Sequence, residues 1–276
     1  MKKYSILTLC LLFVSIFSIS CITCLKIEKG HEPSPVSQTS PAESPSPAET
    51  KPTPEETAKA SPVEEKPSSE TEELPVTDGL IGYWKFDEGE GTAVKDSSKN
   101  GKDGTVTGAT WTEGKYGKAL DFHGENHIVK MDLKIDQSEK SKGATFCAWV
   151  YPASISEGKH QVISSDNGDF DWSILRDIDK WFVFTGLEHY CTEMSVDVNT
   201  WQFLCAVYKP GSGITFYKND KSVKINDIGY EEDTNTLAIG ENPEEGFLEP
   251  FDGKIDEVLI YDRPLSEEEI KKIRER

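Results

Sequence analysis

The stretch FDGKIDEVLIYDRPLSEEEI, at residues 251–270, decides the fold. From residue 254 its side chains alternate as in a β-strand, and Val258 and Ile260 fall on one face. By the same alternation Asp256 falls on the Val258 face, and a buried carboxylate is costly unless it is paired, hydrogen-bonded or bound to a metal. The stretch therefore predicts a buried strand with an acidic position that needs a partner.

The end of the same stretch carries the start signal of a helix. Pro264 ends the strand, and Ser266 with Glu269 forms the S-x-x-E pattern of a capping box. Residues 266–275 are therefore predicted to form a short terminal helix.

Short alternating segments separated by turn residues precede this strand. Residues 80–87 place Trp84 and Phe86 on one face, and residues 144–151 are apolar on both faces, as in a central strand. Further segments of this kind lie at residues 118–122, 127–131, 161–165, 171–175, 181–185, 203–208, 215–218, 222–225 and 236–239. About a dozen short strands without a long helix predict an all-β fold of two packed antiparallel sheets.

The sequence resembles the LamG-like jelly-roll family of concanavalin A-like lectin/glucanase sandwiches. The matching blocks, in order, are GLIGYWKFDEGEGTAVKD (79–96), GKALDFHGENHIVKM (117–131), ATFCAWVYP (144–152), NTWQFLCAVYKPGSGITFYKNDKSV (199–223), LAIGENP (237–243) and the closing stretch. The resemblance implies a jelly-roll sandwich. It implies less about function, because such folds carry many unrelated sites.

Composition divides the chain into three parts. Residues 1–24 have a charged start followed by an apolar run, as in an export signal, and Ser18-Ile19-Ser20-Cys21 resembles a lipobox with Cys21 as the lipidated residue. An uncleaved membrane anchor and plain secretion are the alternatives, and all three place the folded part outside the cytoplasm. Residues 25–78 are rich in Pro, Glu, Ser and Thr and predict a disordered linker, which leaves residues 79–276 for the jelly-roll domain.

The charge of the domain excludes one class of partner. The whole chain has a formal net charge of −19, and residues 79–276 carry −14 of it by count of their charged residues. An acidic domain repels phosphate backbones, so nucleic acid is not expected as a partner. A neutral glycan, a cationic surface and Ca²⁺ are compatible with this charge.

Three cysteines, Cys147, Cys191 and Cys205, lie in the predicted domain and allow three pairings. Cys191 and Cys205 flank the turn predicted at residues 196–200 at similar distances, as a bridge between neighbouring strands requires. We therefore predict a Cys191–Cys205 disulfide with Cys147 as a buried thiol; the alternative is that all three are reduced and buried.

The family resemblance implies a calcium site. Relatives often hold a structural Ca²⁺ where the first strand, a glycine-containing loop and the last strand meet, and the matching ligands here are Asp87, the backbone oxygen of Gly124, and Asp256. In the alternative interpretation Asp87 caps a turn and Asp256 accepts hydrogen bonds from backbone amides.

No catalytic motif is present. The sequence lacks the E-x-D-x-x-E strand of related glucanases as well as G-x-S-x-G, H-E-x-x-H and P-loop patterns. Sugars bind by stacking on aromatic rings beside polar groups, and the best cluster for this is Trp172, Trp181 and Tyr190 with Asp166 and Asn167. The alternative for the two tryptophans is a place in the core.

Three other tryptophans fit core positions of the family, namely Trp84, Trp149 and Trp201. Taken together, the sequence predicts an exported, membrane-tethered, non-catalytic surface module that recognises carbohydrate or glycosylated partners. A glycoside hydrolase with an unrecognised active site and a purely structural surface or adhesion protein are the two rival interpretations.

Overall fold

The computed structural model describes residues 74–135, 141–165, 172–185, 189–226, 236–243 and 248–276, which belong to one compact unit spanning residues 73–276. The predicted signal at residues 1–24 and the linker as far as residue 73 lie outside the described residues. Within the described part of the chain, no helix is both long enough and apolar enough to span a membrane.

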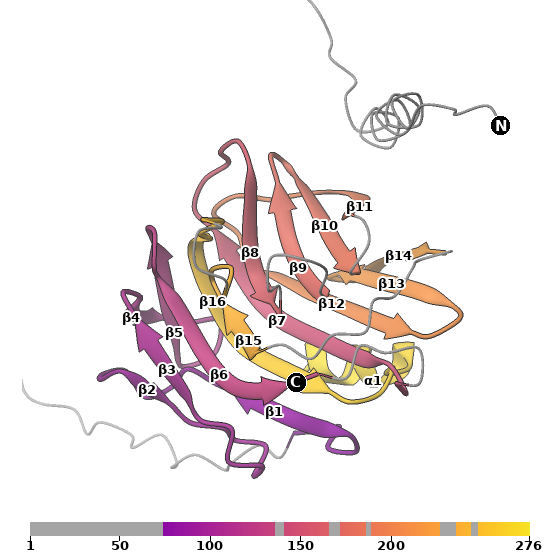
Figure 1. Cartoon of the computed structure of the whole chain (residues 1–276), viewed down its shortest axis with the longest axis horizontal. Coiled ribbons are helices and arrows are strands. Elements are labelled where there is room, and N and C mark those ends of the chain that lie inside the picture. Colours follow the sequence, from indigo (N-terminus) through magenta and orange to yellow (C-terminus); the bar gives the residue numbers. More distant parts are fainter. Residues whose placement is uncertain (1–73, 136–140, 166–171, 186–188, 227–235, 244–247) are drawn as a thin grey trace, which may run out of the picture. The chain divides into compact units, whose positions relative to one another are not determined.

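Two antiparallel sheets of eight strands each form a jelly-roll sandwich (Figure 1). Sheet A contains β1 (Leu80–Trp84), β4 (Thr110–Glu113), β5 (Lys118–His123), β7 (Ala144–Pro152), β12 (Gln202–Lys209), β13 (Gly213–Lys218), β14 (Lys221–Ile225) and β16 (Asp252–Tyr261). Sheet B contains β2 (Ala93–Val94), β3 (Gly104–Thr107), β6 (Ile128–Lys134), β8 (Lys159–Ser164), β9 (Trp172–Asp177), β10 (Lys180–Thr185), β11 (His189–Ser195) and β15 (Thr236–Ile239).

The closing strand β16 organises sheet A. Along one edge it pairs first with β5, from Asp252 to Ile255, and then with β1, from Val258 to Tyr261. Along its other edge it pairs with β7 over most of its length. The stretch that decides the fold in the sequence thus joins three strands from distant parts of the chain.

The buried side chains form two clusters, one on each face of sheet A. Phe146, Ala148 and Val150 of β7 belong to the cluster between the sheets, whereas Cys147 and Trp149 belong to the cluster on the outer face. The alternation within one strand explains why β7 is apolar on both faces. Where its outer face is covered, sheet A is therefore buried on both faces.

Helix α1 (Glu267–Arg274) covers part of this outer face. The capping box is confirmed, because the Ser266 side chain accepts from the Glu269 amide and Glu269 reaches back to the cap. Ile270 and Ile273 of α1 are buried in the outer cluster. The polar cap thus starts the helix, and its apolar side holds it against the sheet.

The compact unit of the structure begins at residue 73, a few residues before the predicted boundary at residue 79. Residues 74–78 were assigned to the linker, but Val76 is only 7% exposed and packs in the outer cluster with Leu74 beside it. The Tyr261 hydroxyl also donates to the Val76 carbonyl at 3.0 Å. A short apolar segment at the edge of a Pro- and Glu-rich stretch is too small to stand out in composition.

The sequence analysis did not predict four short strands that the structure contains, namely β2, β3, β4 and β11.

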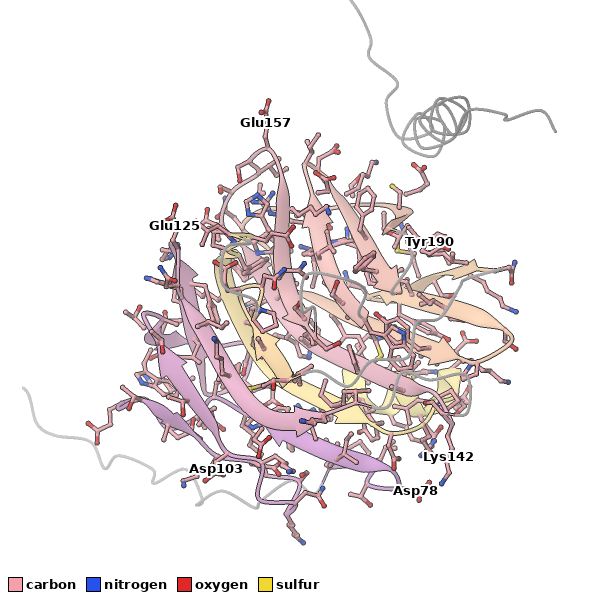
Figure 2. The ribbon with its side chains drawn as sticks, in the orientation of Figure 1. Asp78, Asp103, Glu125, Lys142, Glu157 and Tyr190 are labelled. Atoms are coloured by element: carbon pink, nitrogen blue, oxygen red, sulfur yellow. A yellow bond between two sulfur atoms is a disulfide. The ribbon has the colours of Figure 1, made fainter. Side chains whose placement is uncertain are left out.

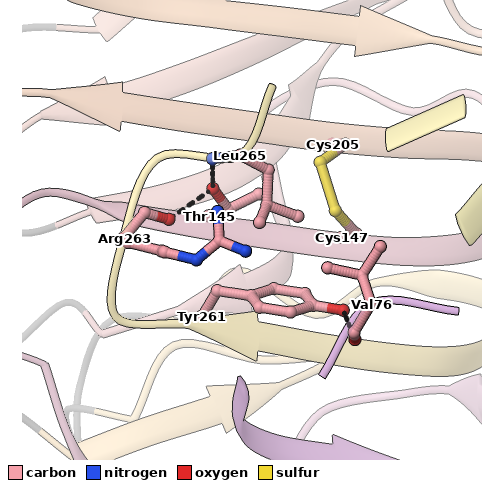
Figure 3. Close-up of a disulfide and its surroundings, with 7 residues drawn as sticks. All are labelled: Val76, Thr145, Cys147, Cys205, Tyr261, Arg263 and Leu265. Atoms are coloured by element: carbon pink, nitrogen blue, oxygen red, sulfur yellow. Dashed lines mark hydrogen bonds between the residues drawn. A yellow bond between two sulfur atoms is a disulfide. The ribbon is translucent and has the colours of Figure 1, made fainter. Parts of the chain in front are cut away.

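The predicted Cys191–Cys205 disulfide is wrong, because Cys205 is bonded to Cys147 (Figure 3). Cys147 of β7 and Cys205 of β12 are directly opposite each other, with their Cα atoms 4.1 Å apart, and both are fully buried in the outer cluster. The sequence prediction assumed that the hairpin around residues 196–200 brings its two cysteines together. The sheet instead pairs β12 with β7, which lies far away in the sequence.

Candidate functional site

A row of polar and aromatic side chains crosses the outer face of sheet A. The register places Thr110 of β4 opposite Asp121 of β5, Asp121 opposite Lys254 of β16, and Lys254 opposite Tyr151 of β7. Directly opposite residues share a face of the sheet. Trp149, two residues before Tyr151, belongs to the outer cluster, so the whole row faces outward.

Two half-buried aromatic rings end this row. The rings of Tyr151 and Trp201 have centroids 5.6 Å apart and planes inclined by 60°, and Lys254 Nζ lies 5.6 Å from the centre of the Tyr151 ring. Trp149, by contrast, is 7% exposed and packs against Phe203. Tyr151 and Trp201 thus keep aromatic surface in contact with solvent at the end of strands that are otherwise buried.

His123 lies between two carboxylates at the other side of the row. Its Nε2 is 2.8 Å from Asp121 Oδ1, and its Nδ1 is 2.7 Å from Asp252 Oδ1. The hydrogen bond to Asp252 is the main cause that raises the pKa of His123 above its ordinary value. Burial acts to raise the pKa of Asp252, but hydrogen bonds from Ser154 and His123 outweigh it and lower that pKa. The imidazole therefore lies between Asp121 of β5 and Asp252 of β16 and connects the two strands.

We name this constellation the outer-face site: Asp121, His123, Tyr151, Trp201, Asp252 and Lys254. It offers exposed ring surface, two carboxylates that accept hydrogen bonds, and an ammonium group that donates them. The backbone amide of His123 also donates to His127 Nδ1 at 3.0 Å, which occupies that nitrogen of His127.

The two tryptophans of the predicted aromatic cluster are buried in the core. Trp172 is 1% exposed and stacks on Tyr208, with ring centroids 4.5 Å apart, and Trp181 is fully buried and donates to Gln202 at 3.2 Å. Both tryptophans point between the sheets, because each is the first inward-facing residue of its strand, Trp172 in β9 and Trp181 in β10. Tyr190 is half-buried against the same core.

Asp166 and Asn167, the polar members of that predicted cluster, lie outside the described residues. Trp201 had been predicted as core and Tyr151 had not been singled out. The alternation of Cys147, Trp149 and Tyr151 toward one face was visible in the sequence. The sequence did not show that this face of β7 is open to solvent at its Tyr151 end.

Only two of the three predicted calcium ligands come near each other: Asp87 and Asp256 both accept hydrogen bonds from amides of residues 115–118, whereas Gly124 is remote from them. Asp87 Oδ1 accepts from the Lys118 amide at 2.9 Å, at the turn that precedes β5. The Gly124 carbonyl lies beyond the opposite end of β5, where it accepts from the His127 amide at 3.3 Å. Among the described residues, no group of three or more His, Cys, Asp or Glu side chains is arranged to hold a metal ion.

Asp256 adopts the alternative that the sequence left open. It is fully buried, and its Oδ2 accepts from the backbone amides of Lys115 at 2.8 Å and Tyr116 at 3.0 Å. Burial raises the pKa of this carboxyl to about 7, with the charge of Asp87 as a smaller contribution, although the two amides oppose the shift. The amides engage one oxygen of each carboxylate, and two carboxylates by themselves supply fewer than the six to eight oxygens that Ca²⁺ prefers.

Asp256 also lies on the opposite face from the one predicted. The register between β16 and β7 shifts after Asp256, where Glu257 has a positive φ of 54°. Asp256 is opposite Trp149 of the outer cluster, whereas Val258 belongs to the cluster between the sheets. A β-bulge inserts one residue between them, and the simple alternation therefore fails at this point.

With this geometry established, comparison with known proteins gives the family. The sequence pattern of the Concanavalin A-like lectin/glucanases superfamily matches residues 125–271, which is just over half of the chain. The chain belongs to this superfamily. No curated protein matches the chain.

Solved structures resemble the concanavalin A-like domain in fold. The binding domain of Paraclostridial Mosquitocidal Protein 1 has a TM-score of 0.59 and 17% identity, over 72% of this chain and 52% of that one. Domain 4 of AbnA, a GH43 extracellular arabinanase from Geobacillus stearothermophilus in complex with arabinotriose, has a TM-score of 0.56 and 18% identity, over 71% and 98%. Trypanosoma rangeli sialidase in complex with sialic acid has a TM-score of 0.58 and 16% identity, over 73% and 33%.

At these identities the similarity shows the fold alone. The chain spans about half the length of the first of these proteins and a third of the sialidase. The activities of those larger proteins therefore do not transfer to the concanavalin A-like domain by this comparison.

Proposed function

We propose that this protein is a non-catalytic carbohydrate-binding module that uses the outer-face site. The observation that carries the proposal is the half-buried pair of Tyr151 and Trp201 beside Lys254, Asp121 and Asp252 on one face of sheet A. The apolar face of a sugar ring stacks on such rings, while its hydroxyls bond to carboxylates and an ammonium group. The arabinotriose and sialic acid complexes of fold neighbours support the same ligand class by analogy.

The arrangement of carboxylates supports binding rather than hydrolysis. A glycosidase needs two free carboxyl groups flanking the bond that it cleaves, usually in a groove. Asp121 and Asp252 are both engaged by His123 on an exposed face. Among the described residues, one cavity of the domain is lined by a single carboxylate, Asp262, and another cavity by none.

A glycan array probed with residues 73–276 tests the proposal. Tyr151→Ala and Trp201→Ala are expected to abolish binding of the glycans that the unchanged domain selects. Phe182→Ala removes a half-buried aromatic ring from β10 of sheet B and serves as the matched control. If neither Tyr151→Ala nor Trp201→Ala changes the binding profile, the outer-face site is not the carbohydrate site. An absence of any selective glycan would contradict the ligand class itself.

The proposal includes export and attachment to a membrane through the N-terminal segment. The apolar run before Cys21 and the long Pro- and Glu-rich segment after it support a lipid or anchor followed by a stalk. Metabolic labelling with a fatty acid, compared between the native chain and Cys21→Ala, tests the lipid. Equal incorporation of label into both proteins would contradict lipidation at Cys21.

A further inference from the structure

A cavity of about 580 Å³ opens at the opposite end of β7 from the outer-face site. Its described lining comes from β1, the loop after β2, the end of β6, the segment before β7 and Asp262, which follows β16. β7 spans nine residues between the two regions. At ~3.3 Å per residue this separates them by on the order of 30 Å. The cavity and the outer-face site are therefore distinct places on the domain.

Three lysines give this cavity a charge opposite to that of the domain. Lys102, Lys134 and Lys142 line it, and none of them forms an ion pair with a residue that the structure describes. Lys134 and Lys142 are exposed, and Figure 2 shows Lys142 at the margin of the domain. Asp262 is the one carboxylate among the described residues of this lining; residues 136–140, which join its segments at 133–135 and 141–143, lie outside the described part of the chain. A local excess of positive charge on a domain with net −14 draws a small anion to this place.

The remaining walls are suited to a compact ring with polar substituents. Ile81, Leu133 and Ile135 supply an apolar surface. The side-chain amide of Asn100 is held by hydrogen bonds to the Leu80 carbonyl at 3.0 Å and to Ser98 Oγ at 2.9 Å, so its position is fixed. A volume within the ~300–1,000 Å³ of small-molecule sites accommodates a sugar with a charged group.

We propose that this cavity binds a sugar that carries a carboxylate or a sulfate, with the anionic group on the lysines and the ring against the apolar wall. This is a second site on the domain and does not depend on the outer-face site. A neutral sugar lacks the charge that the lysines attract, and a bare inorganic anion lacks the ring that the apolar wall contacts.

Titration calorimetry of the full chain with a matched set of ligands tests this assignment. Glucuronic acid and glucose 6-sulfate are expected to bind, and glucose and inorganic sulfate are each expected to bind at least about tenfold more weakly. The triple change Lys102→Gln, Lys134→Gln and Lys142→Gln should reduce the affinity for both acidic sugars by about tenfold or more.

A control triple variant separates the cavity from the charge of the whole domain. Lys130→Gln, Lys221→Gln and Lys271→Gln remove the same charge at exposed positions outside the lining, and the affinity should stay within about twofold. A loss of affinity in Trp201→Ala instead of in the cavity triple would place the acidic sugar at the outer-face site and would overturn the assignment to the cavity. Equal binding of glucose, equal binding of inorganic sulfate, or an equal loss in the control triple would overturn the proposal.

Discussion

The guanidinium of Arg276 is paired with the carboxylate of Glu257, the extra residue of the β16 bulge, whose side chain is only 5% exposed. Arg276 also donates to the Tyr83 hydroxyl at 2.6 Å and lies over the rings of Tyr83 and Tyr116, at 5.2 and 5.7 Å from their centres. The Tyr116 hydroxyl in turn donates to the Arg276 carbonyl at 3.0 Å. These contacts hold Arg276 against the outer face of sheet A.

Arg276→Ala is therefore expected to lower the free energy of unfolding by ~3 kcal/mol, because it leaves the Glu257 carboxylate buried without its cation. In a Glu257→Gln background the same change should cost clearly less, since no buried charge is left behind. Urea denaturation of the four proteins measures the coupling. Additive effects would show that the pair does not act as a unit.

The Cys147–Cys205 bridge closes a loop with a sequence separation of 58 residues between two central strands. Replacing both cysteines with alanine should lower the free energy of unfolding by about 2–4 kcal/mol, through the entropy that the unfolded chain regains. Peptide mapping of the alkylated, unreduced protein checks the pairing. Recovery of a peptide that joins Cys191 to Cys205 would contradict it.

Asp256 should make stability depend on pH. Its folded-state pKa of about 7 lies above the ordinary value for aspartate, so the folded state binds the proton more tightly than the unfolded state. The stabilising contribution of this proton is fully present below pH ~4 and is lost as the pH rises toward ~7, by on the order of 4 kcal/mol at most.

Asp256→Asn keeps an acceptor for the Lys115 and Tyr116 amides but cannot ionise. Its stability relative to the native protein should therefore rise between pH 4.5 and pH 8, as measured by urea denaturation at each pH. The titration of His123 is common to both proteins and cancels in the difference. A difference that is independent of pH would mean that Asp256 does not titrate in this range.

Particular residues show which features of the fold could be predicted from the sequence. The alternation in β16 and the capping box of Ser266 and Glu269 depend on neighbours in the chain, and both were predicted. The bulge at Glu257 reverses the face of Asp256 through a single inserted residue, which alternation alone does not reveal. The partner of Cys205 depends on the order of strands in the sheet, which is set by contacts across the whole domain.

The candidate site was predicted less well for a related reason. Trp172 and Trp181 in the core and Trp201 at its edge have the same side chain, and only the assembled sheets decide which ring contacts solvent. Aromatic composition therefore predicted the type of chemistry but misplaced it. The row from Asp121 through Lys254 to Tyr151 joins residues of three strands and exists only in the folded sheet.

Ile178 at the turn between β9 and β10 is strained. It has a positive φ of 52°, which a β-branched residue adopts at a cost, and its side chain is 48% exposed. Ile178→Asn should raise the free energy of unfolding by about 1 kcal/mol, because asparagine tolerates this conformation. Thermal and urea denaturation check the change. Ile155→Asn, at another exposed isoleucine without a positive φ, should be neutral within about 0.5 kcal/mol.

The central claim is that the outer-face site binds carbohydrate, and the most direct test is the affinity of one array-selected glycan for the native domain and for Trp201→Ala. We expect the loss of the Trp201 ring to weaken binding by at least about tenfold, because stacking on an aromatic ring contributes on the order of 1–2 kcal/mol. The melting temperature and the binding by Phe182→Ala should stay close to the native values. Native affinity in a folded Trp201→Ala variant would contradict the account.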